Sequence, residues 1–247
     1  MLVQDIGSSD DLPALLRGEA FTEQVVIRLA REGSVPDRLQ LLSQAVAGKN
    51  VIHLGFCDHA PSIDGRIRAN RWLHNHLRAS AKRCLGVDIN AEAIEFLKQK
   101  HHVEDVVCAD ICSSASQAFI RDNHWDILLI PEVLEHIGNP VSFLQSIARL
   151  HGPWIERVII TVPNAFRAGN FRNALRNQEA INSDHRYFFT PYTLMKVATD
   201  AGLALESLEF ARFSETRGWR GVLKHAFLRR VPALSENLVL TARFSAN

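Results

Sequence analysis

The chain of 247 residues lacks most of the features that mark specialised classes of protein. Its four cysteines show neither the spacing of a zinc site nor that of a disulfide framework, so we expect reduced thiols and no bound metal. No apolar run approaches the roughly 20 residues that cross a bilayer, and the polar, acidic start does not resemble a signal peptide. The net charge of +1 predicts no general attraction to nucleic acid or to anionic membranes. These absences favour a cytoplasmic globular protein with no integral membrane segment.

The pattern of apolar residues predicts an α/β fold. Hydrophobic residues make up 47% of the chain and charged residues 22%, which is an ordinary globular balance. From residue 50 onward, continuous apolar runs alternate with helical periodicity, which is typical of a parallel sheet covered on both faces. Two later β-like runs are expected to form a terminal antiparallel pair. The expected strands are 51–54, 84–88, 106–110, 125–130, 157–162, 203–210 and 238–244, and the expected helices are 71–83, 91–100, 139–150 and 191–201.

The first fifty residues have a different pattern from the rest. Short apolar clusters at helical spacing, interrupted by glycine and proline, predict two or three helices without a motif of their own. We therefore expect residues 1–49 to be a helical extension and residues 50–247 to be one Rossmann-like, doubly wound domain.

Acidic residues follow two of the predicted strands. Ligands of open parallel sheets bind beyond the carboxyl ends of the strands, so these positions are candidates for a binding site. The carboxylate of Asp88 is suited to accept hydrogen bonds from both hydroxyls of a ribose. Asp110 is suited to accept an adenine amino group, with Ile89 and Ile111 on either side of the ring. The alternative is that both aspartates are ordinary surface or helix-capping residues.

The loop after the first predicted strand has very little glycine. A dinucleotide site needs G-x-G-x-x-G, whereas residues 53–59 contain only Gly55. This absence argues against NAD or FAD, although Gly55 itself still permits a sharp turn and a close approach to a ligand.

Five segments occur in the order found in one enzyme family. Together they span about residues 50–210, which resemble the class I S-adenosylmethionine-dependent methyltransferases, in particular the group that modifies small molecules, lipids and sugars. The resemblance implies a seven-stranded sheet with the last strand inserted antiparallel, and S-adenosylmethionine lying over Gly55, Asp88, Asp110 and Glu132. The segments are CLGVDINAEAIEFLKQ (84–99), CADIC (108–112), WDILLIPEVLEHIGNP (125–140), RVIITVPN (157–164) and HRYFFTPYTLMKVATDAGL (185–203).

The first loop departs from the pattern of that family. His53 stands where an acid is usual, and residues 58–77 are an insertion. We expect Asp58 to take part in cofactor binding, and we hypothesise that it, His59, Trp72 or His74 replaces contacts that glycine amides normally make.

Two histidines are candidates for a catalytic base. His136 lies one helical turn after Glu132, with Glu132 or Glu135 able to orient it, and His185 precedes the late helix. An imidazole with a pKa near neutrality can take a proton from an acceptor hydroxyl. The alternative for both is a purely structural histidine.

Two arginine-rich segments have a structural and a binding interpretation. The arginines of residues 165–184 are more typical of a solvated helix face than of a phosphate or carboxylate grip. The stretch 217–230 is expected to pack as an amphipathic helix on the sheet edge, with contact to an anionic lipid surface as the alternative.

These observations predict methyl transfer from S-adenosylmethionine to a hydroxyl of a small molecule or saccharide, with nitrogen and carbon acceptors left open. A nucleic-acid acceptor is disfavoured, because no strong basic face and no N/D-P-P-Y/F motif is present. The rival classes are a non-catalytic scaffold on the same fold and a nucleotide-dependent oxidoreductase.

Overall fold

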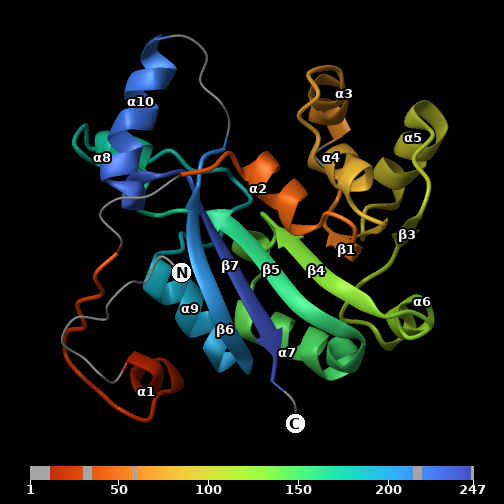
Figure 1. The fold of residues 1–247 in the computed structure, drawn as a ribbon, viewed down its shortest axis with the longest axis horizontal. Coiled ribbons are helices and arrows are strands. Elements are labelled where there is room, and N and C mark those ends of the chain that lie inside the picture. Colours follow the sequence, from red (N-terminus) through yellow and green to blue (C-terminus); the bar gives the residue numbers. More distant parts are fainter. Residues whose placement is uncertain (1–11, 30–34, 58–59, 214–218, 246–247) are drawn as a thin grey trace.

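The computed structural model describes residues 12–29, 35–57, 60–213 and 219–245, which form a seven-stranded sheet flanked by helices (Figure 1). The strand order is β3-β2-β1-β4-β5-β7-β6, and only β7 runs antiparallel to its neighbours. The predicted fold class, the seven strands and the terminal antiparallel pair are confirmed. The strands are β1 (Asn50–Leu54), β2 (Arg83–Asp88), β3 (Val106–Cys108), β4 (Trp125–Pro131), β5 (Ile155–Pro163), β6 (Leu203–Ala211) and β7 (Asn237–Phe244).

The two faces of the sheet bury alternate residues of the strands. Ile52 and its cross-strand partner Leu128 enter the larger apolar cluster, whereas the preceding pair, Val51 and Ile127, enters a second cluster on the other face. Because both faces are covered, the strands are nearly continuous apolar runs. The larger cluster is shared with α1 (Leu12–Arg17), α7 (Pro140–His151) and α9 (Pro191–Asp200), and the second with α2 (Arg38–Ala45) and α4 (Leu73–Ser80).

Side-chain caps fix the starts of several helices. Asn139 accepts a hydrogen bond from the Ser142 amide at 3.0 Å, and Pro140 occupies the first helical position of α7. Thr190 and Thr193 form a reciprocal capping box at the start of α9. Asn90 caps α5 (Ala91–His101) by accepting a hydrogen bond from the Ala93 amide at 3.0 Å. These starts agree with the positions predicted from the sequence.

Two helices were not foreseen, one in the inserted segment and the short α6 (Gln117–Ile120), and one helix is shorter than expected. The inserted segment contains α3 (Ala60–Arg68), although its proline, its glycine and its polar composition give little helical signal. The helix expected over 71–83 is limited to α4. The remaining helical elements are α8 (Ala168–Ala174), α10 (Trp219–Arg230) and the short turns η1 (Ser114–Ser116), η2 (Leu134–His136), η3 (Gly152–Trp154) and η4 (Pro232–Leu234).

The two described N-terminal helices pack on the rest of the structure. Leu12 and Leu16 of α1 belong to the larger apolar cluster beside α9, and Leu42 of α2 is fully buried beside α4. A boundary between residues 49 and 50 stays a prediction. Across the described ranges, no helix has both the length and the apolar character needed to span a bilayer.

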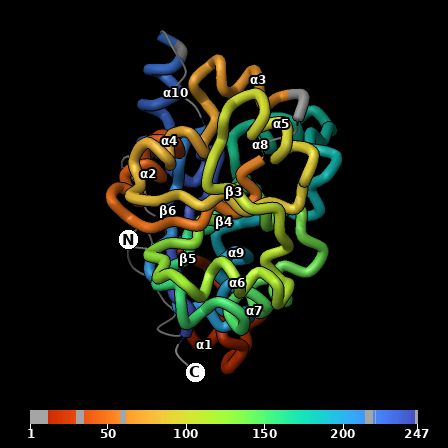
Figure 2. The backbone as a smooth tube through the Cα atoms, turned by 90° about the vertical axis from the view of Figure 1, so that its right-hand side faces the viewer, coloured from red at the N-terminus to blue at the C-terminus, as the bar shows by residue number. Residues whose placement is uncertain are grey.

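The carboxyl ends of the parallel strands meet at one edge of the sheet. Figure 2 shows α3, α4 and α10 toward this end of the molecule and α1 and α7 toward the other. The loops after β1, β2, β4 and β5 therefore converge at one edge, where the sequence predicted a site.

Candidate active site

Gly55 brings the loop after β1 against the segment after β4. Its φ of +68° lies in the left-handed region, and a Cβ atom built on it would be 2.5 Å from Cγ2 of Val133. A larger residue would be strained by its backbone conformation and by this contact. The predicted role of Gly55 in a close backbone approach is thus consistent with its geometry, and the contact with a cofactor stays a prediction.

Asp88 is at the end of β2 and ties down the first loop. Its Oδ2 accepts a hydrogen bond from the Cys57 amide and its Oδ1 one from the Asn90 amide, both at 3.0 Å. Each carboxylate oxygen has a second lone pair, so both can still accept a ribose hydroxyl. Asp88 therefore has the position and the acceptor capacity that the predicted role requires.

The residues predicted to hold the adenine differ in exposure. Asp110 is exposed, and its Oδ1 accepts from the Cys112 amide at 2.9 Å. The Ile89 side chain is 76% exposed, whereas Ile111 is 2% exposed and packs in the larger apolar cluster. Ile89 thus offers a free apolar face near the strand ends, and Ile111 offers little. Asp58 and His59 lie outside the described residues.

A buried histidine pair supports the first loop from behind. Nδ1 of His53 is 3.1 Å from Nδ1 of His74, and burial lowers the pKa of both histidines, that of His74 to about 3. Both rings are therefore neutral, and one donates its N–H to the other. Trp72 donates from Nε1 to the Phe56 carbonyl at 3.2 Å. Because Trp72 and His74 are buried behind the loop, the hypothesis that they replace amide contacts to the cofactor is wrong.

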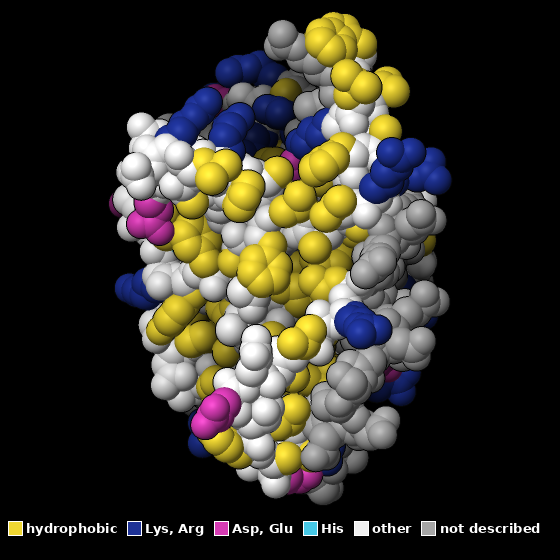
Figure 3. Space-filling model, turned by 90° about the vertical axis from the view of Figure 1, so that its left-hand side faces the viewer, with side chains coloured by type: hydrophobic (Ala, Val, Ile, Leu, Met, Phe, Trp, Pro, Cys, Tyr) yellow, Lys and Arg dark blue, Asp and Glu magenta, His cyan; other side chains and the backbone are white. Residues whose placement is uncertain are grey.

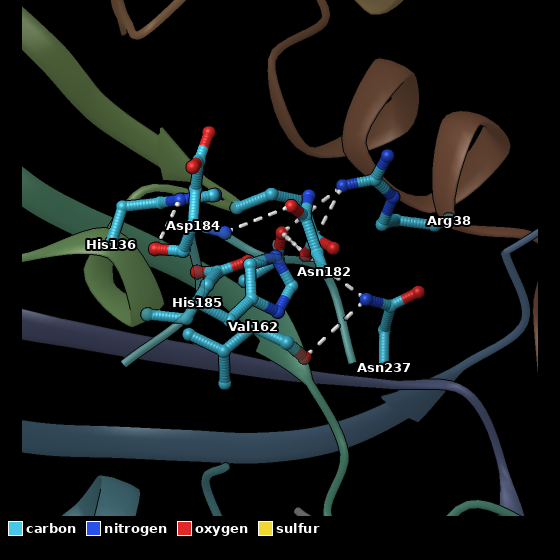
Figure 4. Close-up of polar contacts among 10 residues, drawn as sticks. Arg38, His136, Val162, Asn182, Asp184, His185 and Asn237 are labelled. Atoms are coloured by element: carbon cyan, nitrogen blue, oxygen red, sulfur yellow. Dashed lines mark hydrogen bonds and ion pairs between the residues drawn. The ribbon is translucent and has the colours of Figure 1, made fainter. Parts of the chain in front are cut away.

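Glu132 organises a polar network at the ends of β4, β5 and β7. Its Oε1 accepts hydrogen bonds from Oγ1 of Thr161 and Nδ2 of Asn237, both at 2.9 Å. The guanidinium of Arg38 is 3.4 Å from the same oxygen. In Figure 4, Arg38 and Asn237 point from α2 and β7 toward one region, beside His136 and His185. Oε1 of Glu132 thus already has three partners within the protein. Cofactor binding by Glu132 stays a prediction.

Sequence reasoning missed Arg38 and Asn237 as parts of this network. Arg38 is 7% exposed although it lies on the N-terminal helix α2, and Asn237 opens the antiparallel strand β7. Neither follows a parallel strand, so the rule that led to the other residues does not reach them. The sequence around Arg38 gives no signal that this side chain is buried against Glu132, because the two residues are far apart in the chain.

The two predicted catalytic histidines lie against each other. The rings of His136, at the end of η2, and His185, in the loop before α9, have centroids 4.6 Å apart and are nearly perpendicular. His136 Nδ1 is 3.2 Å from the Asp184 carbonyl oxygen, and Arg186 donates to the His136 carbonyl oxygen. The hydroxyl of Tyr187 donates to the Gly138 carbonyl at 2.7 Å. These bonds join the segment after β4 to the loop before α9.

Glu135 is the acidic neighbour of this histidine pair. Its side chain is fully buried, and among the described residues neither carboxylate oxygen has a hydrogen-bond partner. Burial, reinforced by the charge of Glu132, raises the pKa of Glu135 to about 8. Its Oε1 is 3.9 Å from Nε2 of His185, whose pKa is lowered by burial and by His136. At neutral pH and without a bound cation, the Glu135 carboxyl group is therefore mostly protonated.

Glu135, His136 and His185 could also hold a metal ion. Each offers one ligand atom, and these atoms lie within 4.8 Å of one another. A carboxylate with two imidazoles is a common donor set for divalent cations. Two further groups in the described part of the chain meet the same distance limit but lie away from this edge: His53, His74 and Cys84, and His124, Asp126 and Glu156.

Comparison with known proteins identifies the family. The family described as methyltransferase domain matches residues 69–208, which is more than half of the chain, so the chain belongs to this family. The resemblance to class I S-adenosylmethionine-dependent methyltransferases, and the expectation of an enzyme of that class, are thereby confirmed. No curated protein matches the chain significantly.

Solved structures share the fold at low sequence identity. One is an S-adenosylmethionine-dependent methyltransferase from Archaeoglobus fulgidus, with 16% identity, a TM-score of 0.51 and coverage of 83% of this chain and 90% of that chain. Another is the small RNA methyltransferase HEN1, with 16% identity, a TM-score of 0.55 and coverage of 90% of this chain and 28% of that chain. These likenesses support the fold and leave the acceptor and the site residues as predictions.

Proposed function

We propose that this methyltransferase moves the methyl group of S-adenosylmethionine to a hydroxyl of a small molecule or saccharide. The observation that carries the proposal is the contact between His136 and His185 at the edge of the sheet where Asp88 also lies. A family member with two half-buried imidazoles at this edge has the groups needed to accept the proton of an alcohol. The cytoplasm remains the proposed location.

The cofactor is held by groups from three strand ends. Asp88 accepts hydrogen bonds from the ribose hydroxyls, and Asp110 accepts one from the adenine amino group. Ile89 packs on the adenine ring, with Ile111 beneath it. Gly55 lets the backbone pass close to the methionine end, and Asp58 follows in the same loop. The positively charged sulfur of the cofactor makes the methyl group electrophilic and leaves as a neutral thioether.

The histidine pair acts on the acceptor. The reaction is an in-line displacement, so the acceptor oxygen must be held opposite the sulfur and must lose its proton as the new bond forms. His136 or His185 takes that proton, and the bonds to Asp184 and Gly138 keep the two segments in place.

A second mechanism is favoured by one specific observation: among the described residues, the buried carboxylate of Glu135 has no hydrogen-bond partner. A divalent cation bound by Glu135, His136 and His185 would neutralise this carboxylate and would lower the pKa of a coordinated hydroxyl. The acceptor class is the same in both mechanisms. The rival classes of oxidoreductase and non-catalytic scaffold have no support from the family assignment.

The test is transfer of a labelled methyl group to a panel of saccharides, small alcohols, amines and small RNA. The proposal predicts label on a saccharide or another alcohol and none on RNA, and label only on RNA or on amines would contradict it. The same assay after chelation separates the two mechanisms. Turnover that survives EDTA supports proton transfer to histidine, and turnover that is lost and then restored by Mg²⁺ or Mn²⁺ supports the bound cation.

A further inference from the structure

Helix α10 presents its apolar residues to the outside. Trp219 is 69% exposed, Val222 70%, Leu223 60% and Phe227 49%. These positions are three to four residues apart, so they form one continuous stripe along the helix, which we call the outer stripe. An amphipathic helix that packs on a sheet edge turns its apolar face inward. The orientation expected from the sequence is therefore wrong.

The inner face of α10 is small and partly polar. On the side of α10 that faces the protein, Gly221 and Leu228 are buried and Lys224 is half-buried. Lys224 pairs with Glu236, which immediately precedes β7. This ion pair and the buried Leu228 fix which side of the helix faces the protein. Substitution of Leu223 or Phe227 therefore leaves these two contacts intact.

The charge around the outer stripe is positive. The sequence from 219 to 231 contains four basic residues, Arg220, Lys224, Arg229 and Arg230, and no acidic residue. The side chains of Arg229 and Arg230 are exposed at the end of the helix, and the Lys224 charge is compensated by Glu236. The whole chain has a net charge of only +1, so this positive region is a local feature.

Helix α10 stands at the same edge of the sheet as the candidate active site. It connects the end of β6 at Ala211 with the start of β7 at Asn237, and these two residues are paired in the sheet. Asn237 also pairs with Pro163 at the carboxyl end of β5 and donates to Glu132. Figure 3 shows hydrophobic side chains projecting at this end of the molecule, with lysine and arginine side chains around them.

We propose that α10 is a membrane-surface anchor, whose outer stripe enters the headgroup region of a bilayer that contains anionic lipids. Apolar side chains favour the boundary between headgroups and acyl chains, and cations favour anionic headgroups. A second copy of the chain fits less well, because symmetric pairing through the outer stripe would bring two positively charged helices together. The binding requires no methyl transfer. Its consequence, that the acceptor is presented at a lipid surface, rests on the proposed function.

The test is co-sedimentation of the full chain with vesicles, without any methyl donor. With vesicles of phosphatidylcholine containing 40% phosphatidylglycerol, we expect binding that weakens as salt is added, and much weaker binding to pure phosphatidylcholine. Trp219 emission should shift to the blue on binding, measured in a Trp154→Phe background because Trp72 and Trp125 are buried whereas Trp154 is half-buried. Leu223→Ser with Phe227→Ser should lower the partition coefficient by at least about tenfold.

A matched control replaces exposed apolar residues outside α10. Phe21→Ser with Val26→Ser removes two side chains that are 89% and 62% exposed, and it should leave vesicle binding unchanged. The variant Arg229→Glu with Arg230→Glu should reduce binding to anionic vesicles selectively. Failure of the parent chain to bind anionic vesicles would overturn the proposal, as would binding unaffected by the Leu223 and Phe227 substitutions. Self-association that those two substitutions abolish would instead assign the outer stripe to a second copy.

Discussion

The molecule contains two histidine pairs with opposite surroundings. His53 and His74 lie in a dry layer behind the sheet, where burial lowers the pKa of both far below the ordinary value. His136 and His185 are half-buried at the carboxyl edge, beside the buried acid Glu135, whose Oε1 is 3.9 Å from Nε2 of His185. Both pairs have ring centroids about 5 Å apart, at 5.2 Å and 4.6 Å.

The comparison shows that proximity of histidines does not by itself define chemistry. In the first pair, His53 and His74, which we call the buried pair, the two Nδ1 atoms form a hydrogen bond with each other. Both side chains are buried, so no acceptor molecule can reach them. The second pair, which we call the edge pair, is half-buried and lies at the carboxyl edge, where we propose that methyl transfer occurs. We therefore propose a structural role for the buried pair and a catalytic role for the edge pair.

The largest expected effect is on turnover, from substitution in the edge pair. His136→Ala or His185→Ala should lower kcat by about 10²- to 10⁴-fold at whichever residue takes the proton, because that group acts only in the transition state. The melting temperature should change little. Steady-state kinetics and thermal unfolding of both variants measure this, with the exposed His124→Ala as control. Full activity in both variants would remove the edge pair from catalysis.

The buried pair should give the opposite pattern. His74→Ala creates a cavity and leaves His53 without its partner, so the free energy of unfolding should fall by about 2–3 kcal/mol. The kcat of the folded fraction should be close to that of the parent chain. Urea unfolding with parallel kinetics tests this, and a stable but inactive His74→Ala protein would reverse the assignment.

The pH dependence of stability sharpens the same comparison. His53 and His74 are neutral in the folded protein but gain protons on unfolding below about pH 6.5, so their contribution is complete above that pH and is lost as pH falls below it, toward about 3 for His74. Below that pH, each histidine lowers the free energy of unfolding by up to about 1.4 kcal/mol per pH unit. Unfolding measured from pH 7.5 to 5 should show a shallower slope in His74→Gln. An unchanged slope would mean that His74 is not neutral in the folded state.

The smallest expected effect belongs to Glu135→Gln. Burial raises the pKa of Glu135 to about 8, so without a cation the acid is mostly protonated at neutral pH and glutamine resembles it closely. We expect a change in the activation free energy below about 1 kcal/mol, or about fivefold in kcat. A loss of a hundredfold or more would favour the carboxylate form and the cation-binding mechanism. Kinetics before and after chelation distinguish the two.

The elements that could be predicted carry a local signal. The parallel strands are apolar runs, and α7 and α9 begin with a cap residue followed by proline, so their starts follow from the sequence. Helix α3 has a weak signal and was missed. The pattern of α10 correctly predicts a helix but not its orientation. Periodicity shows which residues share a face, whereas tertiary contacts decide whether that face points inward.

The residues of the candidate site also differ in whether a local sequence signal predicts them. Asp88 ends the parallel strand β2 and His136 ends the turn η2 after β4, so topology places both at the carboxyl edge. His185 begins the last of the five segments that carry the resemblance, and its contact with His136 became visible only in the structure. Arg38 reaches the site from an N-terminal helix, and no local pattern connects it with Glu132. Long-range contacts of this kind depend on the folded arrangement.

The most direct test of the cofactor site is calorimetric titration of the parent chain and of Asp88→Ala with S-adenosylhomocysteine, with NADH as control. We predict binding in the micromolar range for the parent chain and no response to NADH. Asp88→Ala should lose most of that affinity, because the ribose loses its carboxylate acceptor. Absence of binding in a folded parent chain, or equal affinity in both proteins, would contradict the cofactor site described for the carboxyl edge.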